Sequence, residues 1–126
     1  MYQSLALFQT AHAMAQHAGA RQAVTARNVA NADTPDFKAM QIGSFADNYK
    51  ARLDPAMRVT RAGHMSSAAH VPTAKAVEGT SQPNPNGNTV SLEDEMLQAI
   101  NISREHNRAL AIYRHGMTVL RASIGR

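Results

Sequence analysis

The chain of 126 residues is long enough for one ordinary domain; 44% of it is hydrophobic, but only 5% is aromatic and tryptophan is absent. Because aromatic side chains dominate core energetics, a private hydrophobic core would be thin, and the absence of cysteine excludes disulfides, iron–sulfur clusters and thiolate zinc sites. The net charge of +4 comes from basic residues that are spread along the chain, so it favours a mildly basic surface over a nucleic-acid interface.

The first predicted element is one long helix within residues 1–33. From Gln3 to Ala32 there is no proline, one glycine (Gly19) and much alanine, which is typical of a continuous helix. Its apolar residues form two weak stripes and no single clean one, which favours neighbours on more than one side. The first residues lack a basic leader, so no cleaved signal peptide is expected, and no run of about 18 apolar residues predicts a membrane-spanning helix.

This helix is predicted to stop sharply in the polar stretch ARNVANADTPDFKAM, from Ala26 to Met40. Asn31 tolerates the left-handed conformation that often caps a helix. The segment from Thr34 to Phe37 is expected to form a turn with proline at its second position. Phe37 is then expected to fold back onto the helix end, so the chain leaves the helix abruptly.

The middle of the chain, residues 34–90, is predicted to be largely irregular or extended. It holds all five prolines, and its large apolar residues are sparse. A short helix is expected from about Ser44 to Leu53, where Phe45, Tyr49 and Leu53 recur at four-residue spacing. Asn86-Gly87 has the composition of a hairpin turn, but the flanking residues do not alternate.

A second long helix is predicted over residues 91–126. Ser91 is a good N-cap, acidic residues crowd the first turn, and the charges after Glu105 are all arginine, which complements the helix dipole. Apolar residues recur at alternating steps of four and three, which is typical of coiled-coil packing. The predicted assembly seam consists of Leu92, Met96, Ala99, His106, Leu110, Tyr113, Met117, Leu120 and Ile124.

Chemistry-bearing patterns are missing from this sequence. HExxH, GxSxG, GxGxxG and phosphate-loop motifs are absent, and no two of the six histidines lie four residues apart. His106 and the methionines are interpreted as packing residues, and the acidic cluster as a helix N-terminus. We therefore predict no catalytic, cofactor-binding or metal-binding residue, no cofactor and no small-molecule substrate.

The predicted fold is all-α, with the two terminal helices packing as a coiled-coil-like pair within a helical assembly. Two helices alone leave much of their apolar surface uncovered, and each Leu or Ile left bare forgoes about 1.5–3 kcal/mol. Burial must therefore come from other copies or partners, which indicates an assembly protein.

The helix stop resembles the N-terminal motif of the bacterial flagellar rod and hook protein family, and most closely that of its proximal rod members. The motif residues here are Asn28, Ala30, Asn31, Thr34, Pro35 and Phe37. Residues 86–96 and the last residues of the chain are similar to the entry and the close of the family's C-terminal helix. The family usually has glycine where Asp36 stands, which puts the turn type in doubt.

The resemblance implies a structural subunit of the proximal rod, the drive shaft that joins the inner-membrane ring to the hook. It implies a periplasmic location, export through the flagellar type III channel without a cleaved signal, and terminal helices that order on assembly. The implied partners are this chain itself, other rod subunits, the ring-to-rod adaptor, the membrane ring and the export apparatus, with no nucleic acid. Three alternatives remain open: another rod subunit, a basic helical nucleic-acid-binding protein, and a peripheral membrane helix at Tyr2–Phe8.

Overall fold

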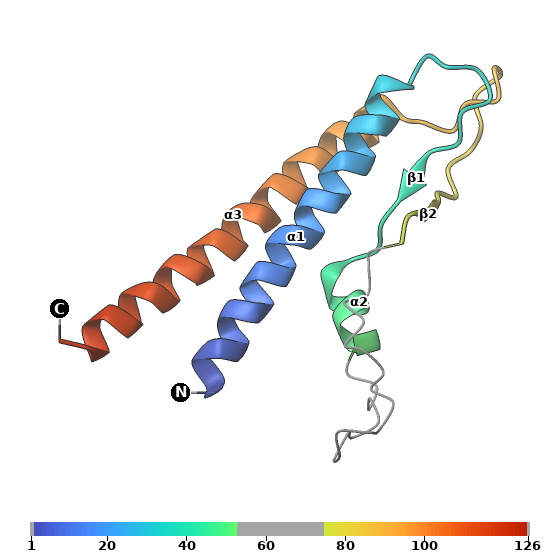
Figure 1. The fold of residues 1–126 in the computed structure, drawn as a ribbon. Coiled ribbons are helices and arrows are strands. Elements are labelled where there is room, and N and C mark those ends of the chain that lie inside the picture. Colours follow the sequence, from blue (N-terminus) through green and yellow to red (C-terminus); the bar gives the residue numbers. More distant parts are fainter. Residues whose placement is uncertain (1, 53–74, 126) are drawn as a thin grey trace, which may run out of the picture.

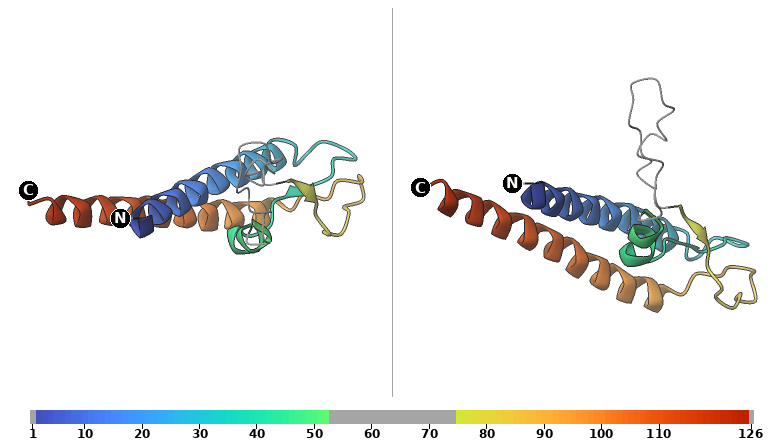
Figure 2. Two further views of the ribbon diagram at one scale, coloured as in Figure 1. Left: turned by 60° about the horizontal axis from the view of Figure 1, so that its bottom comes forward. Right: turned by 90° about the horizontal axis from the view of Figure 1, so that it is seen from below.

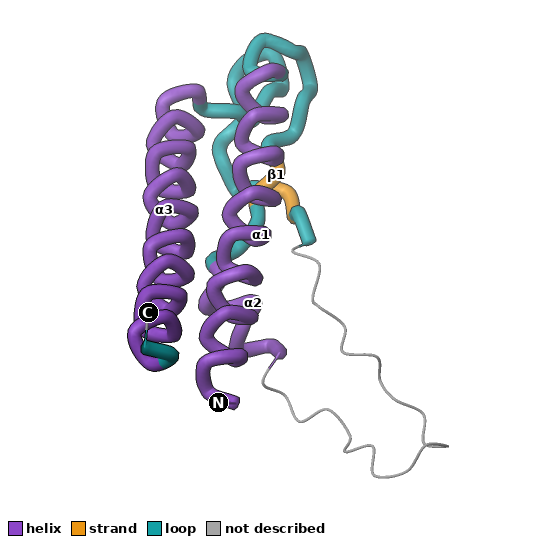
Figure 3. The backbone as a smooth tube through the Cα atoms, turned by 60° about the vertical axis from the view of Figure 1, so that its left-hand side comes forward, coloured by secondary structure: helices purple, strands orange, loops and turns teal. Residues whose placement is uncertain are grey.

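Two long helices lie side by side and run antiparallel along most of the molecule (Figure 1). The computed structural model describes residues 2–52 and 75–125. Helix α1 spans Tyr2–Ala30 and helix α3 spans Leu92–Ser123, and both chain ends lie at the same end of the pair. Figures 2 and 3 show the same pairing from other directions. The predicted all-α fold, with packed terminal helices and an irregular middle, is confirmed.

The core between these helices is thin, because most of its buried apolar residues are small. Ile102 is the one large apolar residue of the described part with less than 2% of its surface exposed. Near the chain ends, Gly116 allows close approach, since a Cβ there would lie 3.1 Å from ring carbons of Phe8. The ring of Phe8 also packs edge-on against Tyr113, with the centroids 5.1 Å apart.

The contact between the helices follows a seven-residue repeat on both. On α3 the buried residues are Glu95, Ile102, Ala109 and Gly116, and on α1 buried Ala11, Ala18 and Thr25 recur at the same spacing. This period is the one expected of coiled-coil packing. The stripe on α3 lies one residue before the predicted seam positions Met96, Leu110 and Met117, so α1 covers a neighbouring face of the helix.

The middle of the chain forms small elements along one side of the helix pair. Strands β1 (Met40–Gln41) and β2 (Val77–Glu78) pair antiparallel, with Met40 opposite Glu78. Helix α2 spans Phe45–Arg52, inside the range predicted for it, and the rings of Phe45 and Tyr49 stack at 5.5 Å. Leu53, the third residue of the predicted spacing, lies outside the described residues.

Candidate assembly site

Helix α1 ends at Ala30, and the left-handed residue that follows it is Asp36, with φ of 58°. Asn31 tolerates a left-handed cap but does not adopt one, because Asp36 is the one non-glycine residue with positive φ among the described residues. Asn31 instead donates from its side chain to the carbonyl of Arg27 (2.8 Å), and its side-chain oxygen accepts from the hydroxyl of Thr34 (3.3 Å). These side-chain bonds satisfy groups at the helix end without a left-handed residue there.

The turn after α1 is closed by the Phe37 amide, which donates to the Thr34 carbonyl at 3.4 Å. Pro35 is the second residue of this turn and Asp36 the third, which is where a type II turn requires positive φ. This requirement explains why the family that the stretch resembles usually has glycine where Asp36 stands. Asp36 fits it while its carboxylate lies directly against Gly87, which itself has φ of 78°. Asp36 also donates its amide to the Asn86 carbonyl at 3.1 Å, so the two turns are joined.

Asn88, which comes much later in the sequence, forms hydrogen bonds with the backbone that follows α1. This residue is fully buried, and its side-chain amide donates to the carbonyls of Asn31, Ala32 and Thr34 at 2.9, 2.8 and 2.8 Å. Its side-chain oxygen accepts from the Val90 amide at 2.7 Å. These three carbonyls belong to the turns that directly follow Ala30, the last residue of α1, so one asparagine holds the exit from α1 and the entry to α3 together.

Asn28 forms the second buried polar centre, in the last turn of α1. It is fully buried, donates to the Met40 carbonyl at 2.7 Å and accepts from the Met40 amide at 3.1 Å. The same side-chain amide donates to Oε1 of Glu95 at 2.7 Å. Asn28 therefore ties three elements together: α1, the start of β1 and the first turn of α3.

The remaining predicted motif residues lie around these two centres. The chains that follow α1 and precede α3 are paired, since Thr89 donates its amide to the carbonyl of half-buried Phe37 at 3.0 Å. Thr89 also accepts the Ala39 amide through its hydroxyl at 2.8 Å. Ala30 and Pro35 are exposed. The motif thus serves the joint between the two helices.

Sequence reasoning missed Asn88 and Glu95 as members of this joint. Glu95 is only 3% exposed, although it reads as one more acid in a helix N-terminus. The three consecutive acids gave no sign that one of them is buried, because the helix phase relative to α1 is set by packing. For Asn88 a signal existed: it lies in the stretch that resembles the family's entry into the C-terminal helix.

A second link between α1 and its neighbours involves His17 and Arg21. Arg21 forms an ion pair with Glu105 of α3 at 2.8 Å. His17 is buried, packs edge-on against Phe45 of α2 and accepts at Nε2 from the side-chain amide of Asn48 (3.1 Å). Burial, followed by the charge of Arg21, lowers the pKa of His17, while Glu105 and the Gly43 backbone act in the opposite direction.

The lowered pKa of His17 predicts a loss of stability in mild acid. Because the unfolded chain binds a proton at a higher pH than the folded one, stability should fall as pH drops through the ordinary histidine pKa of about 6.5. The test compares the thermal midpoint at about pH 7.5 and about pH 5 for the wild type and His17→Gln, which keeps an acceptor for Asn48. The variant should lose less on acidification, and an equal loss in both would contradict this assignment.

The predicted seam residues are found on α3 in two environments. Half-buried beside the α1 contact are Ala99, His106, Leu110, Met117 and Leu120; exposed are Leu92, Met96, Tyr113 and Ile124. Leu97 and Ile100 are also exposed, and they lie near Leu92 and Met96 on the first turns of α3. Whether these residues form an assembly seam stays a prediction.

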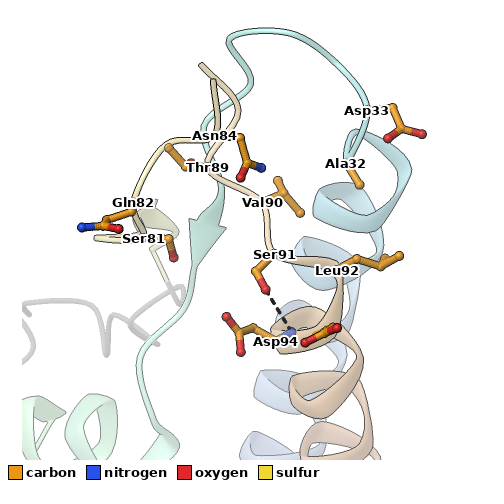
Figure 4. A pocket seen from close by; sticks show the side chains of 11 residues that line it. Ala32, Asp33, Ser81, Gln82, Asn84, Thr89, Val90, Ser91, Leu92 and Asp94 are labelled. Carbon is orange, nitrogen blue, oxygen red and sulfur yellow. Dashed lines mark hydrogen bonds between the residues drawn. The ribbon is translucent and has the colours of Figure 1, made fainter. Parts of the chain in front are cut away.

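Two hollows flank the start of α3 at this polar end. The larger, of about 600 Å³, lies between the end of α1 and residues 81–94, and Figure 4 shows Asp33, Asn84 and Asp94 around it with the Ser91 cap bond to the Asp94 amide. The smaller is about 260 Å³ and is lined by Glu95. Among the described residues no three His, Cys, Asp or Glu side chains gather as a metal site, and no described helix is long and apolar enough to cross a membrane.

The segment that forms much of this helix joint matches a known protein family. A family model described as flagella basal body rod protein matches residues 9–38, the segment that includes most of α1, Asn28 and the turn at Asp36. The chain is similar to the flagellar basal body rod protein FlgB of Escherichia coli strain K12 and to that of Shigella flexneri. It is 33% identical to each over 101 residues, which covers 72% of this chain and 72% of each relative.

Proposed function

Because this chain belongs to the family of flagellar basal body rod proteins, we propose that the side of α3 turned away from α1 is its packing surface in the rod. The chain is a structural subunit of the flagellar rod and assembles there with other rod subunits. The family consists of structural proteins and not of enzymes, so its work lies in contacts between helices.

The observation that carries this proposal is a cluster of large apolar side chains on the first turns of α3. Leu92, Met96, Leu97 and Ile100 are each about half exposed or more. Covering such a side chain contributes about 1.5–3 kcal/mol, and α1 covers a different face of the helix. A large exposed apolar patch rimmed by polar residues is typical of a protein–protein interface.

The thin core supports a second part of the proposal, that the helix pair gains much of its order on assembly. Most buried apolar residues between α1 and α3 are alanine, which contributes little burial. We propose that residues 1–33 and 91–126 act as one helical domain whose packing is completed by neighbours. Residues 34–90 are then the segment that connects its two helices.

The finer placement rests on the sequence resemblance. The protein is part of the flagellum, and we propose the proximal rod in the periplasm, next to the inner-membrane ring and the ring-to-rod adaptor. We further propose delivery through the flagellar export apparatus without a cleaved signal peptide, and no catalytic role. The nucleic-acid alternative gains no support from the relatives.

Placing a charge on the exposed patch should separate assembly from folding. Met96→Asp should reduce incorporation into basal bodies at least tenfold, because an unpaired carboxylate buried in an apolar contact costs several kcal/mol. The free chain should keep its helix content, since Met96 is 59% exposed. The measurement is the amount of chain in purified basal bodies, together with swimming. Ala122→Asp, which adds the same charge at an exposed position on another side of α3, is the matched control. Normal swimming with Met96→Asp would remove this patch from the interface.

A further inference from the structure

The short helix α2 lies beside α1 and meets it at a buried histidine (Figures 1 and 3). The ring of His17 packs edge-on against Phe45 with the centroids 5.6 Å apart, and its Nε2 accepts from the side-chain amide of Asn48 at 3.1 Å. Only 8% of the surface of His17 is exposed. Among the described side chains, no ion pair and no other hydrogen bond joins α2 to either long helix. The docking of α2 therefore depends on this histidine.

The hydrogen bond from Asn48 requires a neutral ring on His17. Nε2 accepts only while its lone pair is free, so the single ring proton is on Nδ1. This Nδ1 is buried and makes no hydrogen bond with the described residues. The Asn48 amide is fixed in orientation, because its nitrogen also donates to the Ser44 carbonyl at 3.1 Å, and turning it would place two oxygens together. A second ring proton would therefore set an N–H group against an N–H group.

The charges around His17 also disfavour a protonated ring. Arg21 follows one turn later on α1 and is held there by its ion pair with Glu105 of α3. Burial first, and then the Arg21 charge, lower the pKa of His17, and the opposing effects of Glu105 and of the Gly43 backbone do not outweigh them. The two groups that face the ring from α2 carry no charge. Protonation thus favours a state in which α2 has moved away and water reaches both ring nitrogens.

We propose that His17 makes the docking of α2 sensitive to pH: protonation of its ring releases α2 from α1, while the joint between α1 and α3 stays closed. The joint depends on the buried side chains of Asn28 and Asn88, and none of their hydrogen bonds involves a histidine. The release is a property of the single chain, so it does not rest on the proposed rod function.

The size of the effect follows from the ordinary titration of histidine. Once α2 has left, the solvated ring of His17 titrates near pH 6.5, whereas the docked ring stays neutral. The equilibrium constant for release should therefore grow by up to about tenfold between about pH 7.5 and about pH 5.5. Docking is thus fully stable above about pH 6.5 and weakens below it, in a range where ordinary carboxyl groups remain ionised.

Hydrogen exchange at the two pH values tests the release directly. Protection factors, which divide out the chemical effect of pH on exchange, are compared for the amides of α2 and of buried Ile102 in α3, using the free chain in sucrose. Protection of α2 should fall by up to about tenfold in acid and should stay well below that of Ile102. No fall in α2 would overturn the proposal. Equal protection of α2 and Ile102 would also overturn it, because α2 would then leave only when the whole chain unfolds.

Two histidine variants identify the group that titrates. His17→Gln keeps an acceptor for Asn48 but binds no proton, so the protection of α2 should not change between the two pH values. His12→Gln, at an exposed histidine of the same helix, is the matched control and should show the full fall of the wild type. An equal fall in His17→Gln would show that another group titrates and would overturn the proposal.

A charge placed opposite the ring should remove the acid response, and this test holds even where His17→Gln releases α2 at both pH values. Asn48→Asp sets a carboxylate beside Nε2, which pairs with a protonated ring, so acid should leave α2 docked or strengthen its docking. Ala46→Asp adds the same charge at an exposed position of α2 and should keep the fall seen in the wild type. A wild-type fall in Asn48→Asp would overturn the proposal.

Discussion

Replacing Asn28 with alanine should lower the free energy of unfolding by about 3 kcal/mol. The change removes the two bonds to the Met40 backbone and the bond to Glu95 together. It leaves the part-buried amide and carbonyl of Met40 and the buried carboxylate of Glu95 without this partner, and each such loss costs about 1–3 kcal/mol. Urea unfolding followed by circular dichroism, in sucrose to favour the compact state of a thin core, measures the loss.

Exchanging the amide and carboxylate groups of Asn28 and Glu95 provides the control. Asn28→Asp has nearly the size of asparagine but brings a second carboxylate to Glu95, so it should be at least as damaging as alanine. Adding Glu95→Gln supplies a side-chain amide that donates to the new carboxylate, so the double variant should regain part of the lost stability. If Asn28→Asp is as stable as the wild type, the bond from Asn28 to Glu95 does not hold the joint.

Replacing Asn88 with alanine is the other change with a large expected effect, about 2–3 kcal/mol of unfolding free energy. Three carbonyls in the turns after α1 and the Val90 amide lose a bond to the fully buried side chain of Asn88. Hydrogen exchange should report the loss locally, with the Val90 amide exchanging much faster than in the wild type.

Two variants separate the hydrogen bonds of Asn88 from its bulk. Asn88→Asp keeps the acceptor for Val90 but turns an oxygen toward the three carbonyls, so it should be at least as unstable as Asn88→Ala. Asn84→Ala, at an exposed asparagine of the same loop, should change stability by no more than about 0.5 kcal/mol. A mild effect of Asn88→Asp would mean that this residue fills space and does not cap the helix.

The helices were predictable because their signals are local. Proline-free, alanine-rich sequence sets α1, and Ser91 with the acids after it sets the start of α3 close to where it is observed. The face that α3 turns toward α1 was not predictable. Several apolar columns compete on this helix, and the contact uses the column in which Ala109 and Gly116 allow close approach.

From the sequence, the joint was predictable only as the place where the first long helix ends. Local rules allow a left-handed conformation at Asn31, yet the structure has this conformation at Asp36. The reason is long-range: Asp36 is paired through its amide with Asn86, and residues fifty apart decide the turn together. Buried hydrogen bonds from Asn28 and Asn88 are likewise long-range, and a single sequence carries no record of their partners.

The polar joint and the exposed apolar side chains of α3 have different roles in the proposed assembly. Polar side chains close the end where both long helices meet the middle segment, so this end is specified within the chain. Along α3 several large apolar side chains stay exposed, and we propose that neighbouring subunits cover them. On this proposal the subunit carries its own joint and obtains further burial from the assembly.

The central claim is that the exposed side of α3 becomes an interface in the rod, and thiol labelling of one position tests it most directly. Met96→Cys introduces the only thiol of the chain on that patch. A maleimide reagent should label it readily in the free chain and hardly at all in intact basal bodies, with recovery after the rod is dissociated. Equal labelling in free and assembled chain would contradict the account, because the patch would then face solvent in the rod.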